Sequence, residues 1–577
     1  MQYEYIIDQQ QANTALQAIH AQTLYVDTET TGLDEHNGKL RLVQLYEPGK
    51  PVIIIDMFRC REHTQLRALF ERYAKNRDAV IVGQNIKFDL KFSLAYTFPI
   101  DFRVYDTMIA EQVIVSGQNG HGLSLDALER KYMRLEREKK SLQQGGWFAP
   151  KLSDKQLKYA AQDALSLETI AQAQQTILRD LGLEATLHIE TDCIADFAEM
   201  EYFGLDIDRE LLEKHTTSMQ QWHDYFEYKI RDALGIQPDV NIHSHQQMVP
   251  ILRKAGLDVN SIQKDILRPY AKDYEWVVWY LKCKKVRTLL TRTLPGLASA
   301  VNRKTGKIYP SFFQLMGERN GTRTGRPSTS DPNVLGMDKM LQSRGNIIAP
   351  EGYIMIDSDY SQVELRVIAD IADDAALLDM FARNIDPYAE TAKIAGFAEV
   401  DAALRTKIKV IALGLIYGMG SKTMCQNLQT KHGVSITVQE TSELRDKILN
   451  SWPGVKAYHR TIKQQRNTET RTLSGRRRIL SKFYFPEAVN SPVQGTAADI
   501  MKIALHRANR DLKALGGRVL LPVYDELLSI IPIDKKDAAM QCQETAMIEA
   551  GRYILQKVEL KVVTTTGYNW FECSQED

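Results

Sequence analysis

The chain has 577 residues, of which 44% are hydrophobic and 25% are charged. These values exclude a wholly disordered, collagen-like or coiled-coil protein, and at about 150 residues for each domain the length predicts three or four structural units. Lysine and arginine together number 73, as do aspartate and glutamate, so the formal net charge is zero. A uniformly basic surface is therefore excluded, whereas a locally basic groove is not, because net charge does not locate charges.

The sequence predicts no membrane-spanning helix, no secretory signal and no paired cysteines. The longest uncharged, mostly apolar stretch runs from Val410 to Ser421 and is too short for a membrane-spanning helix. The N-terminal residues lack the basic and apolar regions of a secretory signal. The 6 cysteines lie far apart and form no CxxC pair, so we expect neither a zinc site nor disulfides, but free thiols in the cytoplasm.

The predicted secondary-structure pattern changes twice along the chain. Up to about residue 185, apolar runs at 23–33 and 79–88 alternate with helical stretches, which predicts an α/β domain. Residues 186–310 are mostly helical and amphipathic. Beyond them, 354–370 is typical of a strand running into a helix, and 518–533 of two apolar strands around a polar turn.

Two acidic residues end the first predicted strand. Asp27 and Glu29 are two positions apart and share a strand face, where their repulsion at roughly 4 Å and an effective dielectric near 20 costs about 4 kcal/mol. A divalent cation would remove that cost, whereas the alternative is a polar strand end followed by a turn. Asp89 follows the second apolar strand.

A later helix adds a tyrosine and another acid. Ser153 and Gln156 fit a capping box at its start, and Tyr159 and Asp163 lie one turn apart on it. A hydroxyl beside a carboxylate suits the orientation of an attacking water. The alternative is a surface helix with a packed tyrosine.

The order DxE, NxxFD and YxxxD across about residues 20–170 resembles the proofreading 3′–5′ exonucleases, which have four acidic residues and a tyrosine. The resemblance implies a ribonuclease H-like domain in which Tyr159 helps to orient water. Gln84 departs from the pattern, since many relatives have histidine there. The acids that the resemblance implies as ligands of two Mg²⁺ or Mn²⁺ ions, and thus as catalytic residues of an active exonuclease, are Asp27, Glu29, Asp89 and Asp163.

A second set of acids lies in the C-terminal half. Asp359 ends a predicted strand, and Ser361 with Glu364 fits a capping box that would make Glu364 a structural cap. Asp525 and Glu526 occupy the turn between two apolar strands. Acids are common in such turns for structural reasons alone, which is the alternative interpretation of this pair.

Between these acids, residues 404–420 predict a helix with cations on one stripe. Arg405 and Lys409 lie one turn apart, and Leu413 and Tyr417 continue the stripe. Two cations at this spacing weaken an isolated helix by a few tenths of a kcal/mol, an effect that an anionic ligand such as a triphosphate would reverse. The alternative is a core helix with a charged first turn. The following GMGSKT lacks the GxxxxGK[ST] spacing, so a Walker-type NTPase is excluded.

Residues 190–577 resemble the family A DNA polymerases, the bacterial DNA polymerase I type. DYSQVELR is similar to motif A of that family, RTKIKVIALGLIYG to motif B and VYDELL to motif C, and TRTGRPSTSDPN and NSPVQGTAADIMK also occur in family order. The implied fold is multidomain, α/β and α+β, with a right-hand polymerase after the exonuclease domain. The expected segments are the exonuclease domain at 1–185, the thumb at 186–310, the palm at 311–370, the fingers at 371–465 and the second part of the palm at 466–577.

The resemblance implies two Mg²⁺ or Mn²⁺ ions in the palm as well. Asp359 and Asp525 would hold them with the backbone carbonyl of Tyr360. Glu526 would support this site as a further acid. Activation of the primer 3′-hydroxyl and loss of pyrophosphate would follow, with Lys409 as a general acid.

Binding roles follow from the same motifs. Glu364 would close off the 2′ position of the sugar, and Tyr417 would stack near the template base. The residues implied in nucleotide binding are Tyr360, Gln362, Glu364, Arg405, Lys409, Leu413 and Tyr417. Those implied in contacts with primer–template DNA, at the minor groove or the phosphates, are Arg326, Asn333, Asn490, Gln494, Lys284 and Arg287.

Several positions depart from the pattern of the polymerase family. Leu413 replaces an aromatic ring that packs on the nucleotide sugar, so sugar discrimination is expected to differ. Tyr524 replaces a histidine, and Pro486 replaces a minor-groove arginine. Leu335 and Pro387 stand where glutamine and histidine are common. None is an implied metal ligand, so we expect a divergent branch of active enzymes.

The setting is also predicted from the resemblance. Because the exonuclease pattern begins almost at residue 1, we expect no 5′-nuclease domain, and the compact arrangement resembles replicative bacteriophage polymerases. We expect viral DNA replication in the host cytoplasm by a monomer that binds primer–template DNA and dNTPs and no membrane. The sequence does not identify replication partners such as a helicase or a single-strand binding protein. A branch that copies genomes with 2-aminoadenine in place of adenine is a further hypothesis.

Two other hypotheses compete with a proofreading polymerase. The first is an exonuclease whose C-terminal half only binds DNA, against which the intact Asp359, Asp525, Arg405 and Lys409 speak. The second is a non-catalytic nucleic-acid scaffold, which predicts that chelation of divalent metal changes nothing.

Overall fold

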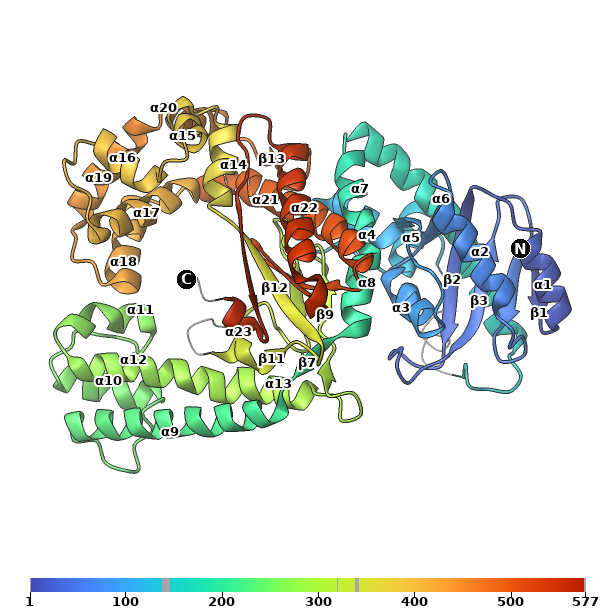
Figure 1. Cartoon of the computed structure of the whole chain (residues 1–577), viewed down its shortest axis with the longest axis horizontal. Helices are drawn as coiled ribbons and strands as arrows, with labels where there is room; N and C mark the ends of the chain where they lie inside the picture. The colour runs from blue at the N-terminus through green and yellow to red at the C-terminus, as the bar shows by residue number, and fades with distance from the viewer. Residues whose placement is uncertain (1, 137–145, 319, 338–341, 575–577) are drawn as a thin grey trace.

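The computed structural model describes residues 2–136, 146–318, 320–337 and 342–574. Figure 1 shows an N-terminal unit on one side of a central sheet, and two helical lobes that flank the sheet on the other side. One core fills the N-terminal unit, and a second runs from the central sheet into the upper lobe.

A six-stranded sheet forms the N-terminal unit, in the order β1-β4-β3-β2-β5-β6. β3 runs antiparallel to both of its neighbours, and the other pairs are parallel. β2 lies inside the sheet, between β3 and β5. The strands are β1 (Tyr3–Ile6), β2 (Thr23–Thr30), β3 (Leu40–Tyr46), β4 (Val52–Asp56), β5 (Val80–Gly83) and β6 (Arg103–Asp106).

Helices cover this sheet, and α6 contacts β2, β3, β4 and β5. The predicted capping box starts α6: the Ser153 hydroxyl accepts from the Gln156 N–H, and the Gln156 side chain accepts from the Ser153 N–H at 3.0 Å. This prediction is confirmed. The helices described up to residue 203 are α1 (Gln9–Gln17), α2 (Thr64–Lys75), α3 (Lys87–Ala95), α4 (Thr107–Val115), α5 (Leu125–Met133), α6 (Asp154–Asp180), α7 (Glu184–Asp192) and α8 (Ile194–Phe203).

The central sheet is antiparallel, in the order β15-β16-β12-β17. Its strands are β12 (Tyr353–Tyr360), β15 (Arg518–Val523), β16 (Glu526–Pro532) and β17 (Val562–Gly567). The long helices α21 (Phe485–Lys513) and α22 (Lys536–Ile554) pack on each other and on the sheet, which explains the nearly continuous burial of β12 and β16. As predicted, the chain passes from β12 into a helix and folds 518–532 into two strands.

Short elements connect the larger ones. They are β7 (Leu205–Ile207), β8 (Lys307–Ile308), β9 (Ser311–Phe313), β10 (Ser328–Ser330), η3 (Ser343–Asn346), β11 (Ile347–Ile348), β13 (Glu469–Arg471), β14 (Arg477–Ile479), η4 (Ile533–Lys535) and α23 (Trp570–Cys573). Their pairings are β10 with β9, β13 with β14, and β7 with both β8 and β11.

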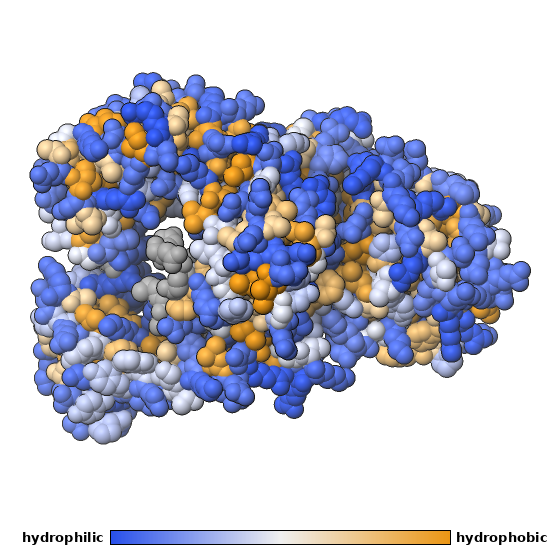
Figure 2. Space-filling model, in the orientation of Figure 1, coloured by the Kyte–Doolittle hydropathy of each residue, from blue (hydrophilic) through white to orange (hydrophobic). Residues whose placement is uncertain are grey.

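Two helical lobes flank the central sheet, and Figure 2 shows a hollow between them. The lower lobe has its own small core around Ile230, Met248 and Tyr280. It comprises α9 (Arg209–Leu234), α10 (His245–Lys254), α11 (Lys264–Leu267), η1 (Arg268–Lys272), α12 (Glu275–Thr288), η2 (Leu289–Thr293) and α13 (Leu294–Ala300). The upper lobe comprises α14 (Val363–Ile371), α15 (Ala375–Ala382), α16 (Pro387–Ile394), α17 (Ala402–Ile416), α18 (Ser421–His432), α19 (Val438–Ser451) and α20 (Pro453–Gln465).

The architecture agrees with the multidomain α/β and α+β class that the sequence predicts. All 6 cysteines are free thiols, as expected. Within the described ranges, no helix is both long and apolar enough to cross a membrane.

Candidate active sites

Three of the predicted acids meet in the N-terminal unit. Asp27 and Glu29 project from β2, and Asp163 projects from α6, which packs on that strand. Each offers a carboxylate oxygen, and these oxygens lie within 4.8 Å of one another. The strand-face argument from the DxE spacing and the helix-face argument for Asp163 thus converge on one site.

The fourth acid, Asp89, lies in the first turn of α3 beside this cluster. Its carboxylate accepts a hydrogen bond from the Thr28 hydroxyl, and Thr28 stands between Asp27 and Glu29 on β2. Burial raises the pKa of Asp89 to about 7. Burial likewise raises the pKa of Glu29 well above its usual value, and the charges of Asp163 and Asp89 add to this shift.

The predicted tyrosine faces the same acids. Burial raises the pKa of the Tyr159 hydroxyl above its usual range, and the neighbouring Asp163 and Glu29 raise it further. The phenol therefore stays protonated near neutral pH and can donate a hydrogen bond. Convergent carboxylates, of which Glu29 and Asp89 have raised pKa values, fit hard divalent cations, because oxygen ligands suit Mg²⁺ and Mn²⁺ and a cation relieves the repulsion.

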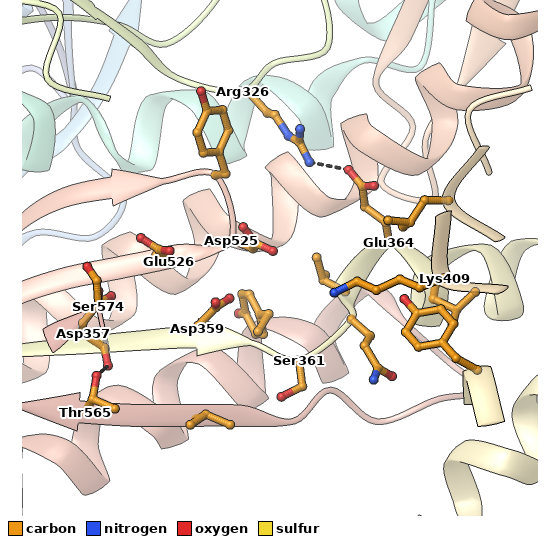
Figure 3. A pocket seen from close by; sticks show the side chains of 18 of the residues that line it. Arg326, Asp357, Asp359, Ser361, Glu364, Lys409, Asp525, Glu526, Thr565 and Ser574 are labelled. Atoms are coloured by element: carbon orange, nitrogen blue, oxygen red, sulfur yellow. Dashed lines mark hydrogen bonds and ion pairs between the residues drawn. The ribbon is translucent and has the colours of Figure 1, made fainter. Parts of the chain in front are cut away.

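A second candidate site lies at the end of the central sheet, in a cavity of about 620 Å³. Asp359 stands directly opposite Glu526 in the antiparallel register of β12 and β16. The Tyr360 N–H donates to the Asp525 carbonyl at 3.1 Å, which ties the end of β12 to the β15–β16 turn. Figure 3 shows Asp359 and Asp525 facing the same space, with Lys409 reaching toward it from the opposite side.

The two acids of the turn differ in their surroundings. Glu526 forms a buried ion pair with Arg344 at 2.8 Å, and Arg344 also lies over the Trp570 ring. Burial raises the pKa of Asp525, and Glu526 adds to that shift. A bound cation would therefore stabilise the charged form of Asp525 more than that of Glu526, because Glu526 already has a cationic partner.

The helix α17 forms the opposite wall of this cavity. Arg405, Lys409, Leu413 and Tyr417 all line the cavity, as their spacing of four residues predicts. The Arg405 guanidinium donates to Asp386 at 2.5 Å, which holds its side chain at the N-terminal end of the stripe. The cations of α17 therefore face the acids of the central sheet across one cavity.

The capping-box interpretation of Glu364 is wrong. The residue before α14 is Gln362, whose φ of 57° places it in the left-handed region, and no side chain caps the helix. Ser361 stands one residue before this N-cap position, and its N–H donates to the Lys561 carbonyl. Glu364 instead accepts from Arg326 and, at 2.5 Å, from the Tyr417 hydroxyl.

Several predicted contacts lie outside the cavity lining. Asn333 organises its own loop by accepting from the Gly336 N–H at 3.2 Å. Lys284 donates to the Ile262 carbonyl at 2.5 Å, whereas Arg287 is exposed on the same helix. The predicted DNA-binding residues that do not line the cavity are Asn333, Asn490, Gln494, Lys284 and Arg287; Arg326 does line it.

The sequence interpretation missed residues that share this cavity. Asp357 lines it from β12, two positions before Asp359. The same i, i+2 argument that linked Asp27 to Glu29 would have found Asp357, because alternate strand residues share a face. Tyr388, Thr565 and Ser574 also line the cavity, and nothing in their local sequence indicates it.

Comparisons with known proteins place the two parts of the chain in two families. Residues 209–572 match the family model described as DNA polymerase family A, and residues 3–179 match that of a 3′–5′ exonuclease.

Two relatives illustrate the extent of the match. DNA polymerase I of Aquifex aeolicus is 28% identical over 605 aligned residues, which cover 99% of this chain and 100% of that protein. DNA polymerase I of Caldicellulosiruptor bescii is 30% identical over 416 residues, which cover 67% of this chain and 47% of that protein. The chain thus matches the whole of the first relative and about half of the second.

A solved structure shares the fold. It is the POL domain of Pol1 from M. smegmatis in complex with DNA primer-template and dNTP, with a TM-score of 0.79, 22% identity and coverage of 96% of both chains.

Proposed function

This chain belongs to DNA polymerase family A and carries a 3′–5′ exonuclease domain, and from that premise we propose that each activity uses its own pair of Mg²⁺ ions. The expected enzyme class, a DNA-directed DNA polymerase with 3′–5′ exonuclease activity, is confirmed by these matches. Domains of both families depend on divalent metal in general. The expected division into exonuclease domain, thumb, palm and fingers is part of the proposal.

The observation that carries the polymerase part is the cavity whose two walls have opposite charge. Asp359 and Asp525 face the cations of α17 across it. A dNTP with its phosphates toward Arg405 and Lys409 fits this polarity. The negative charge of a triphosphate attracts both cations, which otherwise repel each other one turn apart on the helix. In this proposal, primer–template DNA would lie in the neighbouring hollow between the lobes.

In synthesis, Asp359, Asp525 and the carbonyl of Tyr360 would hold the two ions. When bound, such ions activate the primer 3′-hydroxyl and neutralise charge on the phosphates. Arg405 and Lys409 orient the triphosphate, and Lys409 can give a proton to the leaving pyrophosphate. Glu364, fixed by its two hydrogen bonds, closes the space at the 2′ position of the sugar.

In proofreading, the N-terminal cluster would act on a frayed primer end. Asp27, Glu29, Asp163 and Asp89 would hold the two ions around the last phosphodiester. The Tyr159 hydroxyl, held beside Asp163, would help to orient the attacking water. The two clusters are built from different elements, so each activity can be removed without the other.

One gel separates these roles. A labelled primer–template is incubated with Mg²⁺, with and without dNTPs, using the unmodified chain, Asp525→Ala and the double variant Asp27→Ala/Glu29→Ala. We expect lengthening to disappear in the first variant and trimming in the second. Unchanged extension by Asp525→Ala, or loss of both activities in the double variant, would contradict the proposal.

Viral DNA replication and the use of 2-aminoadenine stay predictions of the sequence. The second has a direct test in competition between dATP and 2-aminoadenine deoxynucleoside triphosphate opposite template T. Equal use of the two nucleotides would remove that hypothesis.

A further inference from the structure

Three side chains that commonly bind metals converge in the lower lobe, outside both candidate active sites. His223 lies on α9, His243 precedes α10 and Cys283 lies on α12. Their ligand atoms lie within 4.8 Å of one another, and the only other such group found among the described residues is the Asp27 cluster. The sequence predicted no zinc site because these ligands are 20 and 40 residues apart, unlike a CxxC pair.

The spacing of the two imidazoles suits a shared ion. The Nε2 atoms of His223 and His243 lie 3.1 Å apart. Tetrahedral zinc with Zn–N distances of about 2.0–2.1 Å places its nitrogen ligands roughly 3.4 Å apart. A hydrogen bond between two neutral imidazoles would also give this distance, so the third ligand and the orientation of the rings must decide.

The third ligand and the orientation of the His223 ring both favour an ion. The Cys283 side chain is fully buried, yet its sulfur lies within reach of both imidazoles. Behind His223, the Nδ1 atom lies 3.5 Å from an Asp224 carboxylate oxygen and 3.7 Å from one of Glu227. Carboxylates on that side keep the proton on Nδ1 and turn the Nε2 lone pair inward, as behind metal-binding histidines in general.

We propose that His223, His243 and Cys283 bind a Zn²⁺ ion through two imidazole nitrogens and a thiolate, with water in the fourth position. Two nitrogens and a soft sulfur are a donor set that selects zinc over Mg²⁺, which prefers oxygen. On binding, the S–H bond of Cys283 breaks, a Zn–S bond forms and the proton leaves to solvent. No electron is transferred.

The charges around the cluster are mixed. Glu227 and Asp224 face it from α9, and Arg287 and Lys284 face it from α12. Burial lowers the pKa of His243 to about 4, and the positive charge of Arg287 is the second largest cause of this shift. This imidazole is therefore neutral at pH 7. Burial, followed by Glu227, raises the pKa of the Cys283 thiol to about 12.

The ion would join three parts of the lower lobe. α9 and α12 pack along each other, and hydrogen bonds from Tyr280 to the Ile242 carbonyl and from Arg231 to the Val240 carbonyl already attach the segment before α10 to both helices. A shared ligand set would fix α12, which carries the exposed Lys282 and Arg287. The site is thus separate from both carboxylate clusters, and its three protein ligands leave one position for water.

Cobalt substitution tests the site in the full chain. After treatment with a chelator, we expect Co²⁺ to produce a thiolate-to-cobalt charge-transfer band and intense tetrahedral bands that saturate at one Co²⁺ per chain. An equal amount of Zn²⁺ should abolish them. Carboxylate sites cannot give the charge-transfer band, so bound Co²⁺ at the catalytic clusters is not mistaken for this site.

Variants assign the ligands. Cys283→Ser should lose the charge-transfer band, and His223→Ala or His243→Gln should weaken the tetrahedral bands. The matched controls are Cys542→Ser, a thiol elsewhere, and His245→Ala, whose ring contacts the Asn260 carbonyl instead, and both should keep the full spectrum.

Thermal unfolding gives a second measurement, in an Asp27→Ala/Glu29→Ala/Asp525→Ala background in which both carboxylate sites are disabled. Zn²⁺ should raise the Tm of that protein and leave the Tm of its Cys283→Ser or His243→Gln derivative unchanged. If Cys283→Ser fails to fold, as circular dichroism would show, His243→Gln decides, because His243 is only partly buried. Absence of the charge-transfer band, its appearance only at large excess of Co²⁺, or its survival in both variants would overturn the proposal.

Discussion

The Tyr417 hydroxyl donates a 2.5 Å hydrogen bond to Oε2 of Glu364 and so joins the end of α17 to the start of α14. Oε1 of the same carboxylate accepts from Arg326. Glu364 is therefore held from two sides at the edge of the cavity. A carboxylate fixed in this way can exclude a substituent by position, whereas a mobile one would move aside.

Replacement of Glu364 by alanine is expected to admit ribonucleotides. Removal of the carboxylate opens the space at the 2′ position, and we predict that the ratio of kcat/KM for dNTP to that for rNTP falls by about 10- to 100-fold, corresponding to about 1.4–3 kcal/mol. Single-nucleotide insertion kinetics measure this ratio.

Tyr417→Phe is the matched control, since it removes one hydrogen bond and keeps both the ring and the carboxylate. We expect a smaller loss of discrimination than in Glu364→Ala. Equal slowing of dNTP and rNTP by Glu364→Ala would show that Glu364 supports the fold of the cavity and does not select the sugar.

Exonuclease activity is expected to depend on a competition between protons and metal. Burial raises the pKa of Asp89 to about 7, so this acid is largely protonated at pH 6 in the absence of metal. Trimming should fall as the pH drops through 7, and the midpoint should move to lower pH as Mg²⁺ increases, because the cation displaces the proton. Single-turnover trimming at a series of pH values and two Mg²⁺ concentrations measures the midpoint.

The same pKa shift predicts an opposite trend in stability. The unfolded carboxyl has a pKa near 3.9, so between about pH 4 and pH 7 the folded chain binds more protons than the unfolded chain. Without metal, the free energy of unfolding should decline as the pH rises through that window, and Mg²⁺ should restore it. Asp89→Asn removes the titrating group and should flatten the decline. A midpoint of trimming that ignores Mg²⁺ would contradict this account.

Local patterns predicted those parts of the sites that depend on short-range geometry. Asp27 and Glu29 share a face because strand residues alternate, and Arg405 to Tyr417 form a stripe because the helix repeats every 3.6 residues. The same rule applied to 357–359 would have added Asp357.

Residues whose role depends on distant neighbours could not be predicted in this way. Ser361 matched a capping box, but the left-handed Gln362 starts α14 one residue later. Lys284 appeared as one of several cations, yet its ammonium is bound to the Ile262 carbonyl. The convergence of His223 with Cys283 depends on how α9 packs on α12. Such contacts follow from tertiary packing, which a local pattern does not encode.

A buried charge network that joins α7 to α21 is expected to support the fold. Glu190 pairs with Lys502 at 2.5 Å and also with Arg476, which in turn bonds Asp499 at 2.7 Å through Nε. Glu190→Ala would leave two buried cations with one anion, and we predict a loss of about 3–5 kcal/mol in the free energy of unfolding. Urea denaturation followed by circular dichroism measures it.

An exposed ion pair supplies the control for this network. Glu549 pairs with Arg552 on the surface of α22, and Glu549→Ala should leave the urea midpoint unchanged, since such pairs contribute little. The loss in the free energy of unfolding for Glu190→Gln should lie between those for Glu190→Ala and Glu549→Ala, because it removes the charge and keeps a hydrogen-bond acceptor. A loss for Glu190→Ala no larger than for Glu549→Ala would mean that the network adds no stability.

The two cations of α12 that the sequence assigned to DNA should behave differently. Arg287 is exposed and can reach a phosphate, whereas the Lys284 ammonium is partly buried on the Ile262 carbonyl. Neutralising one phosphate contact changes the slope of log K against log salt by about 1. We therefore predict that Arg287→Ala reduces this slope by about 1 for primer–template DNA, and that Lys284→Ala leaves it unchanged. Fluorescence anisotropy at four or more salt concentrations measures the slope, and an equal reduction in both variants would show that Lys284 leaves its carbonyl to contact DNA.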